Sequence, residues 1–223
     1  MNLTDSYCSM LTPVSLVHFY SLNMSFITPH TGYLPLTMKK PVFSTALCIQ
    51  LLLFVAVGSL LTACDGNTEL MKHTLDGDPS AVQTDLANGA PVDARNNFGW
   101  TALMHAARQD QTATMAVLID AGADINAQDD DGWTPLMRAT TKGNVAAVQL
   151  LLQRKADTEL ADKNNWTPLL WASNRGYGDI LELLIANGAN VNAKGKNGRT
   201  ALYLARNEKH NHILDVLQKA GAK

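Results

Sequence analysis

A four-residue pattern recurs along this chain at one fixed interval. The sequence Trp-Thr-Ala-Leu at residues 100–103 returns as Trp-Thr-Pro-Leu at 133–136 and 166–169, and in weaker form as Arg-Thr-Ala-Leu at 199–202. Each copy begins 33 residues after the previous one. A period of this length is typical of a solenoid, because one such unit is too small to bury its own apolar surface and must stack on a neighbour. The spacing directs the search for function toward binding.

Each unit predicts two helices. The Thr of the pattern can cap the first helix, because its hydroxyl accepts a hydrogen bond from a free backbone N–H in the first turn, and Pro fits the first helical position. Apolar runs at 115–119, 148–152 and 180–185 predict a second helix that is packed on both sides. Gly-Ala pairs such as 122–123 and 188–189 follow it, and Gly takes the left-handed conformation at a helix end at low cost.

The expected fold class is therefore all-α, a solenoid of about five stacked helix-turn-helix units with intervening turn loops. The first and last units depart from the pattern, as end caps must, because one face of each has no neighbour. The predicted repeat domain covers residues 67–223, with units at 67–99, 100–132, 133–165, 166–198 and 199–223.

The pattern resembles the ankyrin repeat, in which a turn and two antiparallel helices recur every 33 residues. The Thr-Pro-Leu start, the Gly-Ala after the second helix, and Asn126 and Asn192 carry the resemblance, which implies a protein-binding function. Two residues depart from it: Lys155 and Asn165 stand where the family has Gly. A left-handed Lys155 would cost about 1 kcal/mol relative to Gly, whereas Asn tolerates that conformation.

A second informative segment precedes the repeats. Lys39 and Lys40 are followed by an uncharged, mostly apolar stretch that closes on Leu-Thr-Ala-Cys, with Cys64 last. Basic residues, an apolar run and a small-residue site predict a secretory signal at 38–63. The ending resembles a bacterial lipobox, which implies lipidation of Cys64 and a short linker at 64–66. The apolar run is also long enough for an uncleaved membrane anchor, and both interpretations stay open.

Either interpretation places the repeats on the outer side of the membrane that the signal enters, because the lysines stay in the cytoplasm. Asp65 after the cysteine resembles the residue that holds enterobacterial lipoproteins in the inner membrane. The expected location is thus the periplasmic face of the bacterial envelope, on the inner membrane. Residues 1–37 contain one acid, Asp5, and no Lys or Arg. We interpret them as a disordered leader from a misassigned gene start, with translation beginning at Met38.

The composition excludes several functions. Cys8 and Cys48 precede the predicted processing site, and Cys64 is the predicted lipid attachment, so no thiol remains for a disulfide, a redox site or a metal site. After Cys64 the chain holds 16 basic and 19 acidic residues. This near balance argues against a nucleic-acid partner.

No catalytic pattern emerges either, and we predict no enzyme activity, no cofactor and no metal site. His210 and His212 could suggest a metal pair, but structural metal sites use four ligands and a polar C-terminal cap is favoured. The acids at 129–131 lack the ligand order of a calcium loop and are expected to be a solvated loop tip. His105 is expected on a helix face near the groove, without a partner base.

The resemblance places a binding groove along the turn tips and the first helices. The residue before each Thr is Trp100, Trp133, Trp166 and then Arg199, and these should form a ladder, because packed helices lie about 8–10 Å apart. Trp and Arg dominate interface energies, although packing of each indole on its own turn is the alternative. Trp171, inside a first helix, is expected to pack between repeats. The other predicted contact residues are Phe98, Asp131, Asn164, Arg108, Gln109, Lys142, Asn174 and Arg175.

We expect a monomer whose partner is a protein that presents carboxylates and an apolar patch. The first functional hypothesis is an envelope-bound scaffold, inhibitor or protective protein. The alternative is a secreted effector that acts on host proteins, against which the lipobox argues because an acylated chain stays with the membrane. An enzyme would need a catalytic constellation, and the sequence shows none.

Overall fold

The computed structural model describes residues 65–223. The predictions for 1–37, for 38–63 and for Cys64 fall outside the described residues. The described part contains ten α-helices, one 3-10 turn and no strand beyond a single bridge between Lys194 and Thr200. The expected all-α repeat fold is confirmed.

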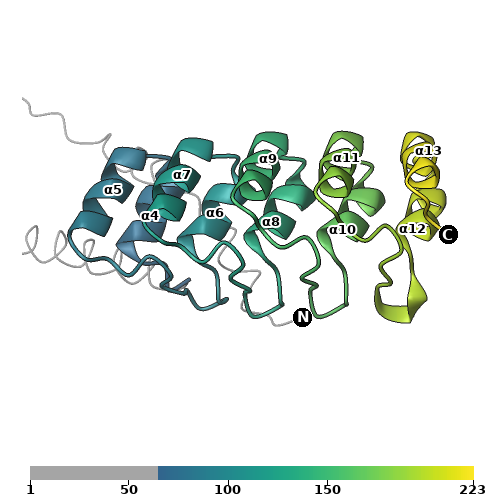
Figure 1. Cartoon of the computed structure of the whole chain (residues 1–223). Coiled ribbons are helices and arrows are strands. Elements are labelled where there is room, and N and C mark those ends of the chain that lie inside the picture. The colour runs from purple at the N-terminus through teal and green to yellow at the C-terminus, as the bar shows by residue number, and fades with distance from the viewer. Residues whose placement is uncertain (1–64) are drawn as a thin grey trace, which may run out of the picture. The chain divides into compact units, whose positions relative to one another are not determined.

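Every unit contributes two helices, and the units follow one another in a row (Figure 1). The first helices are α4 (Glu69–Asp76), α6 (Ala102–Arg108), α8 (Pro135–Lys142), α10 (Pro168–Arg175) and α12 (Ala201–Asn207). The second helices are α5 (Pro79–Ala87), α7 (Thr112–Asp120), α9 (Val145–Gln153), α11 (Gly178–Ala186) and α13 (Asn211–Lys219). The 3-10 turn η1 (Lys196–Gly198) precedes α12.

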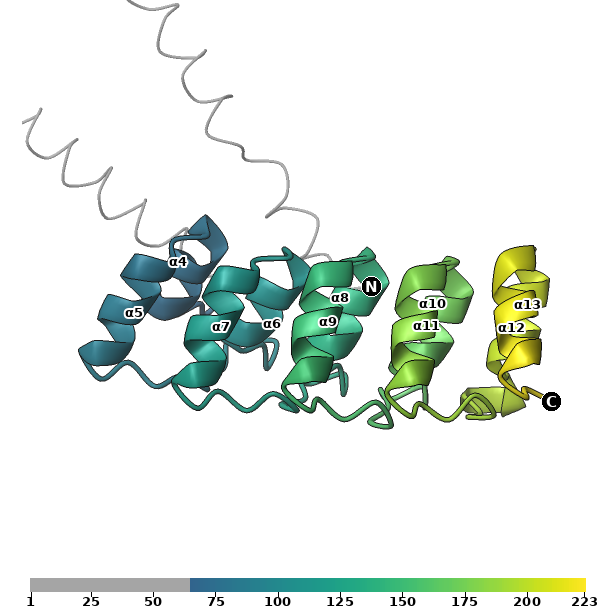
Figure 2. The ribbon, with the colours of Figure 1, turned by 45° about the horizontal axis from the view of Figure 1, so that its top comes forward.

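The helices form two layers. The main contacts of a first helix are with its own second helix and with the first helices of the neighbouring units, and the second helices contact one another in the same way. The loops that join the units project below the helices in Figure 1, and Figure 2 shows the same order of pairs from a second angle. The turn tips and the first helices therefore border one continuous surface.

Threonine hydroxyls begin most of the first helices, as the pattern predicts. The side chains of Thr101, Thr134 and Thr200 each accept from the backbone N–H three residues later. Thr68 does the same for α4, so the first unit keeps a cap that its divergent sequence had concealed. Thr167 is the exception, since its buried hydroxyl has no partner among the described residues.

Left-handed residues end the helices and shape the turns. Gly143 closes α8 with φ 77°, and Gly176 closes α10 with φ 79°. Lys155 has φ 68° at a position where the neighbouring units have Gly122 and Gly188, and Asn165 has φ 60° in its turn. Both residues therefore adopt the left-handed conformation considered for them from the sequence. Lys155 carries the strain of a side chain in this region.

The core is a column of residues that repeat with the units. Leu118, Leu151 and Leu184 of the second helices are completely buried. Burying such a side chain contributes about 2 kcal/mol, so the stacked units are held mainly by these columns. In α12, Tyr203 is 52% exposed where Leu170 of the preceding unit is fully buried. The reason is that no further unit among the described residues covers this side of α12.

Candidate functional site

The predicted tryptophan ladder is one continuous stack of rings and guanidinium groups. The Cζ of Arg138 lies 3.9 Å from the ring centroid of Trp100 and 4.5 Å from that of Trp133. The ring of Trp171 lies 4.7 Å from that of Trp133 and 4.5 Å from that of Trp166. We call these five residues the aromatic array. All five are half-buried, so each contacts its neighbours and also keeps part of its side chain accessible.

Two sequence positions alternate to build the array. One is the residue before the capping Thr, which supplies Trp100, Trp133 and Trp166 from the turns. The other lies five residues later on the first helix, where Arg138 on α8 and Trp171 on α10 reach back to the Trp of the preceding unit. The expected inter-repeat packing of Trp171 is confirmed. Contacts of this geometry contribute about 0.5–2 kcal/mol each, so the array also joins neighbouring units.

A buried carboxylate fixes the second and third of the turns that carry a tryptophan, and the amide oxygen of Asn96 does so in the first. In the turn that closes the second unit, Asp129 Oδ1 accepts from the backbone N–H groups of Asp131 and Trp133, at 2.9 Å each, while Oδ2 pairs with Arg138. Asp129 is only 7% exposed. The expectation of a solvated tip at 129–131 is thus wrong for Asp129, because its carboxylate is needed inside the turn. Asp130 and Asp131 are exposed, as expected.

The same device recurs in the next unit and then stops. Asp162 Oδ1 accepts from the backbone N–H of Trp166 at 3.0 Å, and Oδ2 accepts from Trp171 Nε1 at 3.2 Å. In the fourth unit the equivalent residue is Gly195, where a Cβ would lie 2.9 Å from the Trp166 ring. Close approach of Gly195 to that indole therefore replaces the carboxylate. Arg199, which follows in the ladder position, makes no ring contact among the described residues.

His105 lies at the amino-terminal end of the array. Its ring centroid is 4.9 Å from that of Trp100, and the residue is 8% exposed. Burial, together with the smaller effect of the positive charge of Arg108, lowers the pKa of His105 to about 4. The imidazole is therefore neutral near pH 7, and its buried Nε2 has no hydrogen-bond partner among the described residues.

An open pocket of about 450 Å³ adjoins this end of the array. Its walls are formed by Phe98, Trp100, His105, Arg108 and Arg138, with Asp65, Asp130 and Asp131 among the other lining residues. Phe98 is 55% exposed, and the Cζ of Arg108 lies 5.4 Å from the Trp100 ring centroid. Among the described residues no carboxylate pairs with Arg108. The pocket thus combines an exposed ring with a cation that has no partner, which suits recognition of an acidic and partly apolar group.

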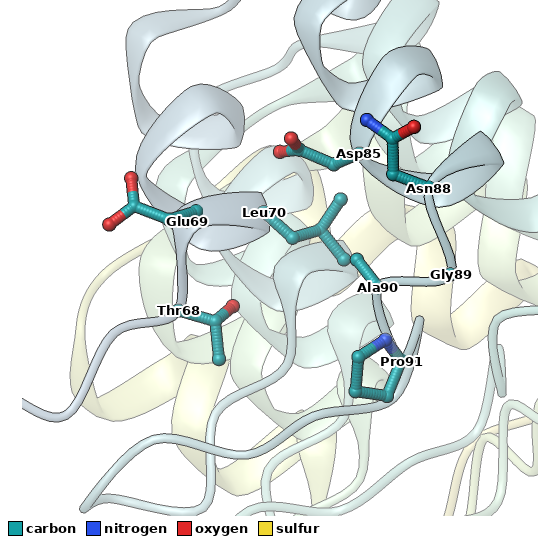
Figure 3. A pocket seen from close by; sticks show the side chains of 8 residues that line it. All are labelled: Thr68, Glu69, Leu70, Asp85, Asn88, Gly89, Ala90 and Pro91. Carbon is teal, nitrogen blue, oxygen red and sulfur yellow. The ribbon is translucent and has the colours of Figure 1, made fainter.

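A second pocket, of about 300 Å³, lies in the first unit between the start of α4 and the loop after α5. Figure 3 shows the side chain of Leu70 among the lining residues, together with those of Glu69 and Asp85. Asp85 is already engaged, because His73 Nδ1 lies 2.7 Å from its Oδ2. This pocket shares no residue with the aromatic array.

The remaining predicted contact residues lie along the same surface but outside the array. Gln109, Lys142 and Arg175 are exposed at the ends of first helices, as predicted. Asn174 is half-buried and its carbonyl accepts from His210 Nε2 at 3.1 Å. Asn164 is exposed at a turn tip. The aromatic array and the pocket beside it therefore include Trp100, Trp133, Trp166, Phe98, Arg108 and Asp131, whereas the other predicted contact residues lie outside both.

Sequence reasoning missed the residues that connect the tryptophans. Arg138 looked like an ordinary helix residue, and Asp129 and Asp162 looked like loop acids. Their signal is the register itself, because Asp129 and Asp162 are one repeat apart, as are Arg138 and Trp171. Aligning the units would have placed Asn96, Asp129 or Asp162 four residues before each Trp and a stacking residue five residues after it.

Two further findings concern residues 65–223 alone. No cluster of three or more His, Cys, Asp or Glu side chains has a geometry that could hold a metal ion. None of the helices in this part of the chain has both the length and the apolar character needed to cross a bilayer.

Comparison with known proteins agrees with the repeat architecture. A family model described as ankyrin repeats (3 copies) matches residues 60–162 and 155–223. A comparison with curated proteins finds no match. The two matched segments span most of the chain and coincide with the stacked helix pairs and their turns. The chain therefore belongs to the ankyrin-repeat family.

Proposed function

We propose that this protein is a non-enzymatic binding module on the bacterial envelope, which holds a partner protein along the turn tips and first helices. Ankyrin repeats generally mediate protein–protein interaction, and the described residues add a specific surface for it. The observation that carries the proposal is the aromatic array, which ends at the unpaired Arg108 and the exposed Phe98. Trp and Arg are the residue types that contribute most at protein interfaces.

The array is suited to binding because it is already packed. The rings of Trp133 and Trp166 are held by Trp171 and by the carboxylates below them. A partner that contacts their accessible parts immobilises few additional side-chain rotamers, so less conformational entropy is lost on association. A rigid surface of this kind favours a partner protein that is itself folded.

The location forms part of the proposal. Lys39 and Lys40, the apolar stretch after them and Cys64 support export and attachment to a membrane, through a lipid or an uncleaved anchor. Asp65 favours the inner membrane. There the repeats would act in the periplasm as a scaffold, or as an inhibitor or protective protein. Membrane fractionation of a Cys64→Ser variant tests this: lipid attachment predicts loss of the acyl label and a different distribution between fractions.

Site-specific crosslinking tests the binding surface directly. We would place a photoreactive amino acid at Phe98 and, as a matched control, at Gln153, which is exposed on a second helix. Irradiation of intact cells should yield a defined adduct from position 98 and none from position 153. Equal adducts from both positions, or adducts from Gln153 alone, would move the interface to another face. Alanine at all three ladder tryptophans is a poorer test, because those indoles also hold the units together.

A further inference from the structure

We propose that the pocket beside Phe98 and Arg108 receives one carboxylate side chain, an Asp or Glu, of the partner protein. This inference rests on the proposed function and specifies the chemistry of one end of the interface. The pocket measures about 450 Å³, which accommodates an acidic side chain together with part of its neighbouring backbone. Its lining includes residues of the first two turns and the amino-terminal end of the aromatic array.

One of the two arginines of the pocket has no carboxylate partner. Arg108 is exposed and has no ion pair among the described residues, although the other cation of the pocket, Arg138, is paired with Asp129. Arg138 Nε is buried without a hydrogen-bond partner in the same part of the chain. A guanidinium group binds a carboxylate through two parallel N–H···O bonds, so Arg108 is the natural primary contact.

The apolar part of the pocket fits the stem of an acidic side chain. Phe98 is 55% exposed, and the indole of Trp100 forms the wall beneath Arg108. The methylene groups of a Glu or Asp can contact these rings while the carboxylate reaches the guanidinium. His105 adds a neutral wall, because burial keeps its pKa well below 7. Arg108 is therefore the cation that distinguishes a carboxylate from an amide here.

The surrounding acids set the selectivity. Asp65, Asp130 and Asp131 also line the pocket, and Asp131 has a cation only at 3.9 Å, the Nζ of Lys163. These carboxylates repel a group with several negative charges, such as a phosphate or a nucleic-acid backbone. A single carboxylate can face Arg108 and keep its distance from them. A basic residue next to the acid in the partner would be attracted by these same three carboxylates.

Peptide display on the full-length chain in detergent micelles tests the pocket. Peptides selected on the unmodified protein should share an Asp or Glu, and fluorescence anisotropy should show about tenfold weaker binding when that acid becomes Asn or Gln. Arg108→Gln should cause the same loss, and combining both changes should cause little more, because each removes the same contact. Arg108→Lys keeps the charge and should give an intermediate loss.

Arg206→Gln is the matched control, because Arg206 is an exposed arginine in the last turn of the first helix α12, outside the pocket and outside the predicted contact residues. It should leave the affinity unchanged. Selected peptides without a shared acid, or equal losses from Arg108→Gln and Arg206→Gln, would overturn the carboxylate pocket. So would a selection that enriches no peptide at all. The crosslinking experiment at Phe98 decides the proposed function independently of these outcomes.

Discussion

Arg138 is the residue on which the array depends most. Its guanidinium lies between the rings of Trp100 and Trp133 and pairs with Asp129, whose side chain is almost completely buried. Removing the cation leaves a buried carboxylate without its counter-charge, which is more costly than losing an exposed ion pair.

Arg138→Ala should therefore lower the free energy of unfolding by about 3 kcal/mol, as measured by urea denaturation followed by circular dichroism. Arg175→Ala provides the control and should change it by less than about 0.5 kcal/mol, because that side chain is exposed. Similar values for the two variants would mean that the stack contributes little to stability.

His105 should make the fold sensitive to mild acid. An unfolded His binds a proton near pH 6.5, whereas burial lowers the pKa of the folded His105 to about 4. Between these values the unfolded state takes up more protons, so the free energy of unfolding should fall as the pH drops from 6.5 to 4, by up to about 3 kcal/mol. His105→Leu should remove this part of the pH dependence and also raise stability near pH 7 by about 1 kcal/mol, because an unpartnered buried nitrogen is lost.

His73 provides an internal contrast. Its hydrogen bond to Asp85 raises the pKa of His73, so the stability from this pair is present below pH 6.5 and is lost as the pH rises through the raised value. The two histidines thus act in different pH windows. If unfolding curves of His105→Leu kept the full acid dependence between pH 4 and 6.5, the carboxylates would be its source.

At this scale the sequence predicted only part of the site. The ladder positions of Trp100, Trp133 and Trp166 follow from the period, and in the structure Arg138 and Trp171 connect the three rings. Their partners could not be recognised from residue type, because His105, Arg138 and Trp171 occupy equivalent positions with three different chemistries. The stack requires only a flat side chain at this position of each unit. A search for one residue type that repeats in every unit therefore does not find the position.

Helix capping offers a matched comparison at the scale of the element. Thr134 Oγ1 accepts from the backbone N–H of Met137 at 3.2 Å, whereas Thr167 makes no such bond to α10. Thr134→Ala should therefore reduce the free energy of unfolding by about 1 kcal/mol, and Thr167→Ala should reduce it by distinctly less. Thermal melts of both variants check this, and equal shifts would show that capping bonds do not account for the difference.

The end of α9 contains a correctable strain. Lys155 has φ 68°, and the same position in the neighbouring units is held by Gly122 and Gly188. Lys155→Gly should raise the free energy of unfolding by about 1 kcal/mol, because Gly has no Cβ penalty in this conformation. Urea denaturation measures the gain. The reverse change, Gly188→Lys, should destabilise, and a neutral result in both directions would rule out backbone strain as a factor.

Element boundaries were largely predictable because they follow local rules. Thr, Pro and Gly at fixed offsets specify where each helix starts and stops, independently of distant contacts. The cap by Thr68 was missed because the residues after it depart from the Thr-Pro-Leu pattern. The inward turn of Asp129 was missed for the opposite reason, since only the folded loop distinguishes it from Asp130.

On the scale of the whole molecule, each unit is stabilised by its contacts with the adjacent units. The main contacts of α12 and α13, outside their own unit, are with α10 and α11 of the preceding one. A chain that stops after Gly198 should therefore stay folded through α11, with a urea m-value lower by roughly one fifth, since m scales with the surface exposed on unfolding. Hydrogen exchange on α8 and α9 provides the check. Complete loss of protection there would show that the array folds only as a whole.

The aromatic array also has a direction. At its amino-terminal end two guanidinium groups, those of Arg108 and Arg138, lie near the ring of Trp100, and its other end is made of the adjoining indoles of Trp171 and Trp166. A partner segment that lies along it meets charge first and uncharged rings last. The same segment placed in the opposite sense would bring its acidic group to the rings and leave Arg108 unmatched. Polarity of this kind selects the orientation of a bound chain as well as its composition.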